Sequence, residues 1–146
     1  MLQEGLHALL ANDSAVQTIV GVPRTDGRDG VFPVTIPKNA PLPAMVYARI
    51  AGHENDTLDG RGDLRITRFQ ISCYATDTST ASGYDLAAAL TAAAKDAILG
   101  FHGTLPDADA TEVDDIVLIL ELETYDAVSK NFQSLFDVEV WFRNAS

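Results

Sequence analysis

The chain has 146 residues, of which 47% are hydrophobic, and its 21 acidic residues against 10 basic ones give a net charge of -11. This length predicts one domain over residues 1–146, and the apolar share argues against a wholly disordered chain. The excess of carboxylates argues against a nucleic-acid-binding protein, which needs lysine and arginine opposite the phosphates. No run approaches about 18 apolar residues and no secretory signal pattern is visible, so we expect no membrane association.

The first 43 residues divide into a helical and an irregular segment. Apolar residues at helical spacing predict a helix over Leu2–Val20, with a break where Asp13 or Ser14 can cap the second piece. Residues 21–43 hold five of the six prolines, which predicts an irregular arm. We expect a mobile surface loop over Arg24–Gly30, followed by an extended segment over Val31–Ile36 that adds a short edge strand.

Two strands and a polar connection come next. Alternation of apolar and polar residues predicts strands at Ala44–Ala51 and Asp63–Tyr74. The polar, turn-rich stretch Gly52–Gly62 between them predicts a β-hairpin with a long tip. A slip in the alternation of the second strand suggests a bulge near Thr67 and Arg68.

The longest helix is expected after this hairpin. Polar residues over Thr76–Thr80 can accept hydrogen bonds from its first N–H groups, helix-forming residues continue to Leu99, and Gly100 tolerates a left-handed end. Its apolar side is rich in alanine, which predicts close packing on a flat sheet. The residues on this side are Leu86, Leu90, Ala93, Ala94, Ala97, Ile98 and Phe101, with Ala87 at its margin.

The last third predicts an acidic loop and a second hairpin. Pro106–Asp115 carries five acidic residues but lacks the glycine and glutamate of a calcium-binding EF-hand loop, so it is interpreted as solvated. Ile116–Thr124 and Phe132–Phe142 alternate as strands, with the larger apolar face expected inward against the helix. The fold class is therefore α+β: a mainly antiparallel sheet of two β-hairpins, with an alanine-rich helix on one face and an N-terminal helix.

No pattern of catalytic or ligand-binding residues is present in the sequence. His7, His53 and His102 lie in separate segments without zinc-ligand spacing, and we expect His7 to have a structural or solvent role. Phosphate-binding loops, the dinucleotide fingerprint and the nucleophile elbow are absent. Cys73 alternates with buried strand positions, which predicts a small buried hydrophobe rather than a nucleophile, and as the single cysteine it is compatible with a reducing compartment. We therefore expect no enzyme, no metal and no cofactor.

Four stretches, in order, resemble one protein family. They are LQEGLHALLANDSAVQTIVG, IPKNAPLPAMVYARI, RFQISCYATDTSTASGYDLAAALTAAAKDAIL followed by FHGTL, and ELETYDAVSKNFQSLFDVEVWF. Their order and spacing resemble the tail terminator, or tail completion (tail-to-head joining), proteins of long-tailed bacteriophages, prophages and gene transfer agents. The stretch PRTDGRDG departs from this pattern, because it is longer and more charged than the family's loop.

The resemblance implies a virion protein that is assembled in the cytoplasm of a bacterial host. It implies a ring, a hexamer, that caps the head-proximal end of the tail tube, ends tube polymerisation and provides the surface for head joining. The implied partners are other copies of the chain, the major tail-tube protein and a head-completion or connector protein. DNA would pass through the ring without specific binding, because carboxylates repel phosphates.

Two sets of residues follow from this interpretation. Candidates for the lining of the DNA channel are acidic: Asp107, Asp109, Glu112, Glu121 and Glu123. Candidates for subunit or partner contacts lie on the irregular arm, on the first hairpin tip and on the last strand: Arg24, Arg28, Lys38, His53, Glu54, Asp56, Leu58, Arg61 and Trp141. For Trp141, packing under the first helix is the equal alternative.

Two other functions stay open from the sequence. Another neck or head–tail connector component would bind the portal side of the particle and not the tail-tube protein. A small dimeric ligand-binding or enzymatic α+β domain would instead be a monomer or dimer with a concave pocket of converging polar groups.

Overall fold

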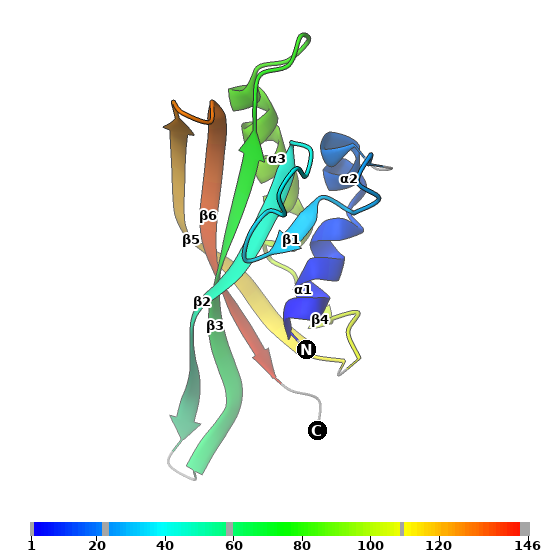
Figure 1. Ribbon diagram of the computed structural model, residues 1–146. Coiled ribbons are helices and arrows are strands. Elements are labelled where there is room, and N and C mark those ends of the chain that lie inside the picture. Colours follow the sequence, from blue (N-terminus) through cyan, green and yellow to red (C-terminus); the bar gives the residue numbers. More distant parts are fainter. Residues whose placement is uncertain (1, 22–23, 58–59, 109, 144–146) are drawn as a thin grey trace.

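The computed structural model describes residues 2–21, 24–57, 60–108 and 110–143, and for residues 51–57 and 60–64 only the backbone. A single sheet runs through the described part of the chain, with the strand order β1-β2-β3-β6-β5-β4. All neighbouring strands are antiparallel except β1 and β2. The helices lie together on one side of this twisted sheet (Figure 1). The expected α+β fold with two antiparallel hairpins is confirmed.

The elements have the following bounds. The helices are α1 (Leu2–Ala11), α2 (Ser14–Val20) and α3 (Gly83–Ile98), and the strands are β1 (Val31–Pro33), β2 (Ala44–Thr57), β3 (Gly60–Ala75), β4 (Gly103–Thr104), β5 (Glu112–Asp126) and β6 (Asn131–Arg143).

The N-terminal helix is broken where the sequence predicts it. Asp13 is the N-cap of α2, and its carboxylate accepts a hydrogen bond of 3.1 Å from the Val16 N–H. Gly21 ends α2 with φ 81, a left-handed conformation that glycine adopts without steric cost. The edge strand β1 forms as expected but ends at Pro33, and its Val31 pairs with Met45 of β2 in parallel register.

The prediction of a turn-rich tip over Gly52–Gly62 is wrong. The backbone continues as paired strands to Thr57 in β2 and from Gly60 in β3. Figure 1 shows this part of the hairpin as a two-stranded ribbon that extends away from the helices. Backbone hydrogen bonds hold such a ribbon whatever the side chains are, so a polar composition does not exclude a strand. Leu58 lies outside the described residues.

The predicted bulge exists but is carried by the other strand. The register between β2 and β3 shifts after Arg49, so that Ile50 is the extra residue in β2, while β3 pairs with β6 without a shift. The apparent slip in β3 has another cause: Thr67 is buried and takes the core-facing position, while Ile66 lies on the opposite face beside Trp141.

The helix α3 packs through its alanine-rich side, as predicted. Its buried residues include Leu90, Ala94 and Ile98, and it contacts β3 and β6. Thr91, which is not among the residues of the predicted apolar side, is buried as well. The N-cap is Ser82, beyond the predicted stretch; Asp77, within that stretch, accepts a 2.7 Å hydrogen bond from the Gly83 N–H.

The core lies between the helices and one face of the sheet. Phe69 and Phe136, on adjacent strands, are its largest fully buried side chains, and Leu6, Leu10 and Leu90 meet them from the helices. Cys73 belongs to the same cluster, which confirms the prediction of a buried cysteine. Burial disfavours the charged thiolate and raises the pKa of Cys73 to about 12.

Because of this pKa, Cys73 is expected not to react with a thiol reagent at pH 8 while the protein is folded, since the thiolate is the reactive form. In denaturant the same thiol should react fully, with one thiol titrated per chain. The measurement is the rate of a chromogenic thiol reaction with and without denaturant. Fast reaction of the folded protein would contradict the burial.

Candidate assembly surfaces

The strand β5 does not present the face that its sequence pattern predicts. Leu118 lies opposite Val138, but the next paired residue is Leu120, opposite Asp137, so Ile119 is an extra residue in the ladder. A bulge of this kind reverses which residues point to each face beyond it. The prediction that one apolar face of β5 runs inward along its whole length is therefore wrong. Beyond the bulge, Leu120 and Leu122 lie on the face away from the helices.

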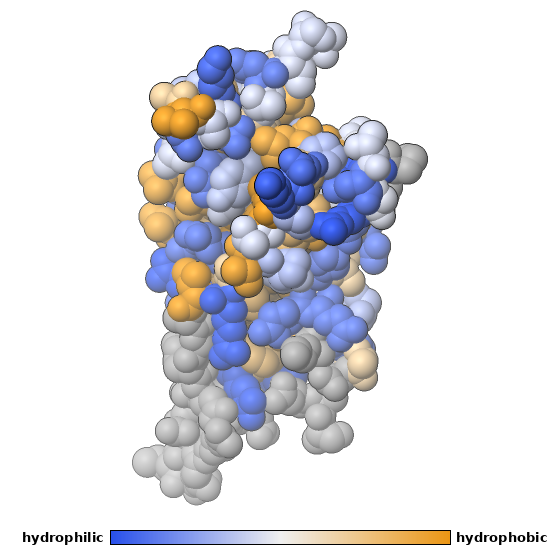
Figure 2. All heavy atoms as spheres, viewed as in Figure 1, coloured by the Kyte–Doolittle hydropathy of each residue, from blue (hydrophilic) through white to orange (hydrophobic). Residues whose placement is uncertain are grey.

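Hydrophobic side chains of β5 are in contact with solvent on both faces, with Leu120 and Leu122 on the face away from the helices and Leu118 and Tyr125 on the helix side. The exposed fractions are 41% for Leu118, 42% for Ile119, 49% for Leu120, 51% for Leu122 and 52% for Tyr125. Figure 2 shows hydrophobic surface on the side of the molecule where β5 lies in Figure 1. Exposed hydrophobic side chains gathered along one strand are typical of a site of protein association.

The outer edge of β5 is also unpaired over most of its length. The short strand β4 pairs only with Glu112 and Val113, and the Gly100 N–H donates to the Ile116 carbonyl. In the part of the chain that the structure describes, no strand pairs with this edge over Val117–Asp126. An edge strand with free N–H and C=O groups is a template for pairing with another strand.

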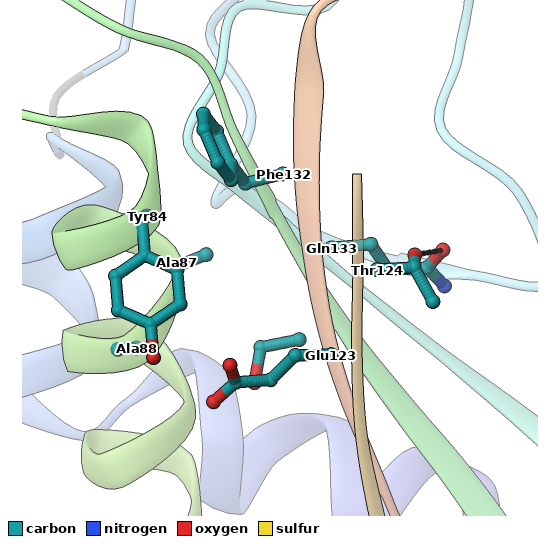
Figure 3. Close-up of a pocket in the computed structure, with 8 residues that line it drawn as sticks. Tyr84, Ala87, Ala88, Glu123, Thr124, Phe132 and Gln133 are labelled. Carbon is teal, nitrogen blue, oxygen red and sulfur yellow. Dashed lines mark hydrogen bonds between the residues drawn. The ribbon is translucent and has the colours of Figure 1, made fainter. Parts of the chain in front are cut away.

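A groove separates β5 from α3, because the helix covers β3 and β6 but not β5. It has a volume of about 170 Å³, and an ion pair between Lys95 of α3 and Glu121 of β5 crosses it. Figure 3 shows the groove near the start of α3 and the end of β5, where Tyr84 and Glu123 face each other beside Phe132. A hydrogen bond to Glu123, and the charge of that carboxylate, raise the pKa of Tyr84.

The acidic channel candidates form two separate groups. Glu121 and Glu123 lie on the helix side of β5 near its end. Asp107 and Glu112 lie near its start, where Thr111 donates to Asp107 from its N–H at 2.9 Å and its hydroxyl at 2.8 Å. Burial opposes ionisation of Asp107, but these hydrogen bonds outweigh it and lower its pKa. Asp109 lies outside the described residues.

The two groups lie far apart along the strand. Glu112 and Glu123 are eleven positions apart in β5, which corresponds to roughly 35 Å at about 3.3 Å per residue. They also lie on opposite faces of the sheet, because Glu112 pairs with Arg143 on the face away from the helices.

Arg24 does not fit the contact surface that the sequence suggested. Its side chain is buried, and its guanidinium donates to the carbonyls of Val20 at 3.0 Å, Pro43 at 2.7 Å and Pro41. It also donates to the Asp26 carboxylate at 3.3 Å. Arg24 therefore attaches the proline-rich arm to the end of α2.

The loop expected to be mobile is held by further hydrogen bonds. Asp26 accepts from the Arg28 N–H at 3.0 Å, and that bond together with Arg24 holds the pKa of Asp26 below its usual value. Asp29 accepts from the Val31 N–H at 3.0 Å. Arg28 and Lys38 are exposed, as a contact role requires.

His7 has the structural role that was expected, through partners that its neighbouring sequence does not indicate. Its Nε2 lies 2.7 Å from the Asp29 carboxylate and its Nδ1 lies 3.1 Å from the Tyr47 hydroxyl. Burial, followed by the charge of Asp29, raises the pKa of Tyr47. The contacts join α1, the arm and β2, whose positions 7, 29 and 47 are too far apart in sequence to form a motif.

The remaining interface candidates lie on the sheet. Trp141 is half-buried on the face away from the helices, so it does not pack under the first helix. The backbones of His53, Glu54, Asp56 and Arg61 belong to the paired ribbon of β2 and β3.

Metal sites and membrane-spanning helices were also sought among the described residues. No group of three or more His, Cys, Asp or Glu side chains that could hold a metal ion occurs among them. None of the helices described is long and apolar enough to cross a membrane.

Residues 4–143 match the family model described as "Tail completion protein gp17". The chain belongs to this family. A chain in the structure "Virion of native gene transfer agent (GTA) particle" has the same fold, with a TM-score of 0.67 and 17% identity over 97% of this chain and 94% of that one. A comparison with curated proteins gives no match. The family resemblance found in the sequence is confirmed, and the protein is a structural component of a virion tail.

Replacement of Arg24 by methionine should lower the free energy of unfolding by about 3 kcal/mol, because buried carbonyl oxygens lose their donor. Arg28→Met, the same change at an exposed position four residues away, should stay within about 0.5 kcal/mol. Chemical denaturation monitored by circular dichroism measures both. Equal effects of the two substitutions would show that Arg24 does not hold the arm.

Proposed function

We propose that the protein forms a ring, a hexamer, at the head-proximal end of the tail tube. The ring ends polymerisation of the tube and presents the surface to which the head is joined. The observation that carries this proposal is the match of nearly the whole chain, residues 4–143, to a family of tail completion proteins. A ring component that covers the last tube subunits is the simplest way to complete a tubular polymer.

The arrangement of surfaces supports a function based on shape and charge. Leu118, Ile119, Leu120, Leu122 and Tyr125 are exposed along β5, and the groove beside this strand is crossed by an ion pair rather than lined by converging catalytic groups. The contact residues that we propose are Arg28, Lys38, Trp141 and the ribbon of β2 and β3. The proposed partners are neighbouring copies, the major tail-tube protein and a head-completion or connector protein.

The channel of the ring is proposed to be acidic. Because Glu112 lies on the opposite face of the sheet from Glu121 and Glu123, the two groups line the channel at different heights, where the twist of β5 turns each of them toward the axis. Repulsion between carboxylates and phosphates keeps the DNA from adhering to the wall. The chain's net charge of -11 is consistent with such a surface.

Light scattering and negative-stain imaging of the purified protein, alone and with tail-tube subunits, test the ring. We expect closed rings of six copies, either free or on tube ends, and tubes that stop growing when the protein is added. A ring that binds a portal-side component and ignores the tube would assign the protein to the neck or connector instead. A monomer or dimer that never joins a closed ring, even with tube subunits, would refute the proposal.

Reversal of charge at the proposed channel should make the ring bind DNA. Glu112→Lys and Glu123→Lys are each expected to give rings that retain duplex DNA at low salt and release it as salt rises. Asp96→Lys, which makes the same change on the exposed side of α3, is the matched control and should retain no more DNA than the original protein. Filter binding at several salt concentrations measures this, and equal retention by all three variants would remove these acids from the channel.

A further inference from the structure

The groove between α3 and β5 is one continuous hollow of modest size. Ala88, Glu123 and Ser134 line both the part shown in Figure 3 and the wider part beside Lys95. The space stays open on the helix side because an alanine side chain is a single methyl group. Its volume of about 170 Å³ is below the roughly 300 Å³ of the smallest small-molecule pockets. The groove therefore suits one long side chain better than a metabolite-sized ligand.

The charge of the groove is negative and only partly balanced. Lys95 is the one basic residue among those that line it, and it is paired with Glu121. Among the described residues, no basic side chain forms an ion pair with Glu123. The Glu123 carboxylate accepts a hydrogen bond from the Tyr84 hydroxyl, and the charge of Asp85 also acts on Tyr84. Glu123 thus keeps acceptor capacity for a cation.

Aromatic rings stand beside Glu123 at the same end of the groove. The ring centroid of Phe132 lies 6.3 Å from that of Tyr84 and 4.5 Å from that of Tyr125. Tyr84 and Tyr125 are nevertheless 49% and 52% exposed. Figure 3 shows Tyr84 and Glu123 directed toward each other from opposite walls. A cation that enters between them is attracted by the ring face as well as by the carboxylate.

A buried hydroxyl in the wider part of the groove lacks a strong partner. Thr91 lines this part and is 6% exposed. Its oxygen has only the Cys73 thiol beside it, which is a weak hydrogen-bonding group. Buried hydroxyls are normally hydrogen-bonded, so Thr91 has capacity for a further N–H donor.

We propose that this groove binds an arginine side chain of a partner protein, with the guanidinium on the Glu123 carboxylate and against the ring of Tyr84. Arginine is favoured over lysine because its planar guanidinium stacks on a ring while it donates two hydrogen bonds to a carboxylate. The partner is a protein with a basic surface and not a second copy, because two chains of net charge -11 repel each other at an acidic groove. The groove lies within one chain, so its binding of arginine does not depend on ring formation.

The carboxylates of this groove are also the ones proposed to face DNA at the end of β5, and both roles follow from their charge. A negative groove attracts guanidinium and repels phosphate. An occupied groove is neutralised at Glu123, so it repels DNA fully only after the partner's arginine has left.

The probe is the peptide Gly-Gly-Arg-Gly-Gly with both ends blocked, which removes its terminal charges. It is titrated into isotope-labelled protein while the NMR spectrum is recorded. We expect saturable shifts of the backbone signals of Tyr84, Glu123 and Ser134. The same peptide with citrulline, which has the shape of arginine without its charge, should give no such shifts, and the peptide with lysine should bind more weakly.

Three variants test the residues. Glu123→Gln should weaken binding of the arginine peptide about tenfold, because a charge-assisted hydrogen bond is lost. Tyr84→Ala should weaken it about threefold, because the ring is lost. Asp96→Asn, which removes the same charge as Glu123→Gln from the exposed side of α3, should change the affinity by less than about twofold. Circular dichroism verifies that each variant is folded.

Four results would overturn the proposal. Equal weakening by Glu123→Gln and Asp96→Asn would show attraction to the acidic chain as a whole. Equal binding of the citrulline peptide would remove the need for a cation, and equal binding of the lysine peptide would remove the choice of arginine. The same shifts on concentrating the protein alone would assign the groove to a second copy. None of these results affects the proposed ring, which light scattering and imaging test separately.

Discussion

The pairing of β5 with β6 is the constraint on which the surfaces of this protein depend. Ile119 is one residue more than β6 can match, and the ladder continues only because β5 bulges there. Beyond the bulge, Leu120 and Leu122 are directed away from the helices, and Glu121 and Glu123 take the helix side. A single extra residue thus places hydrophobic side chains in solvent and carboxylates along the groove beside α3. Exposed hydrophobic residues on an unpaired strand are typical of a surface that associates with another protein.

On the helix side of the sheet, the hydrophobic residues are buried. Alanine lets α3 lie close on β3 and β6, where Leu90 and Ile98 meet Phe69 and Phe136 in the hydrophobic core. The proline-rich arm contributes Val31 to this core, and polar contacts hold the segment before it: Arg24 donates to the carbonyl of Pro43, and His7 contacts Asp29. The result is a rigid body on one side and an unpaired strand edge on the other. This division suits a subunit that must keep its own shape while it joins others.

Much of the fold could be predicted because its signals are local. The spacing of apolar residues in α3, the alternation in β3 and β6, and the break at Asp13 each depend on residues a few positions apart. The ribbon of β2 and β3 beyond Ala51 could not be predicted from the sequence. Backbone pairing holds it, and its polar composition resembles that of a loop. The site was less predictable than the fold. Arg24 looked like a free surface charge, yet its acceptors at Pro41 and Pro43 lie 17 and 19 residues away.

The sequence by itself determined the class of the fold, the single buried cysteine and the family, since composition, periodicity and the order of short motifs are properties of the chain alone. Only the tertiary structure decided which residues of β5 face outward and which strand edges remain free. The physical reason is that the facing of a strand depends on its register with a neighbour, and one extra residue in that register reverses it. No pattern within β5 shows which of its residues face outward, because the extra residue is extra only relative to the residues of β6 that pair with it.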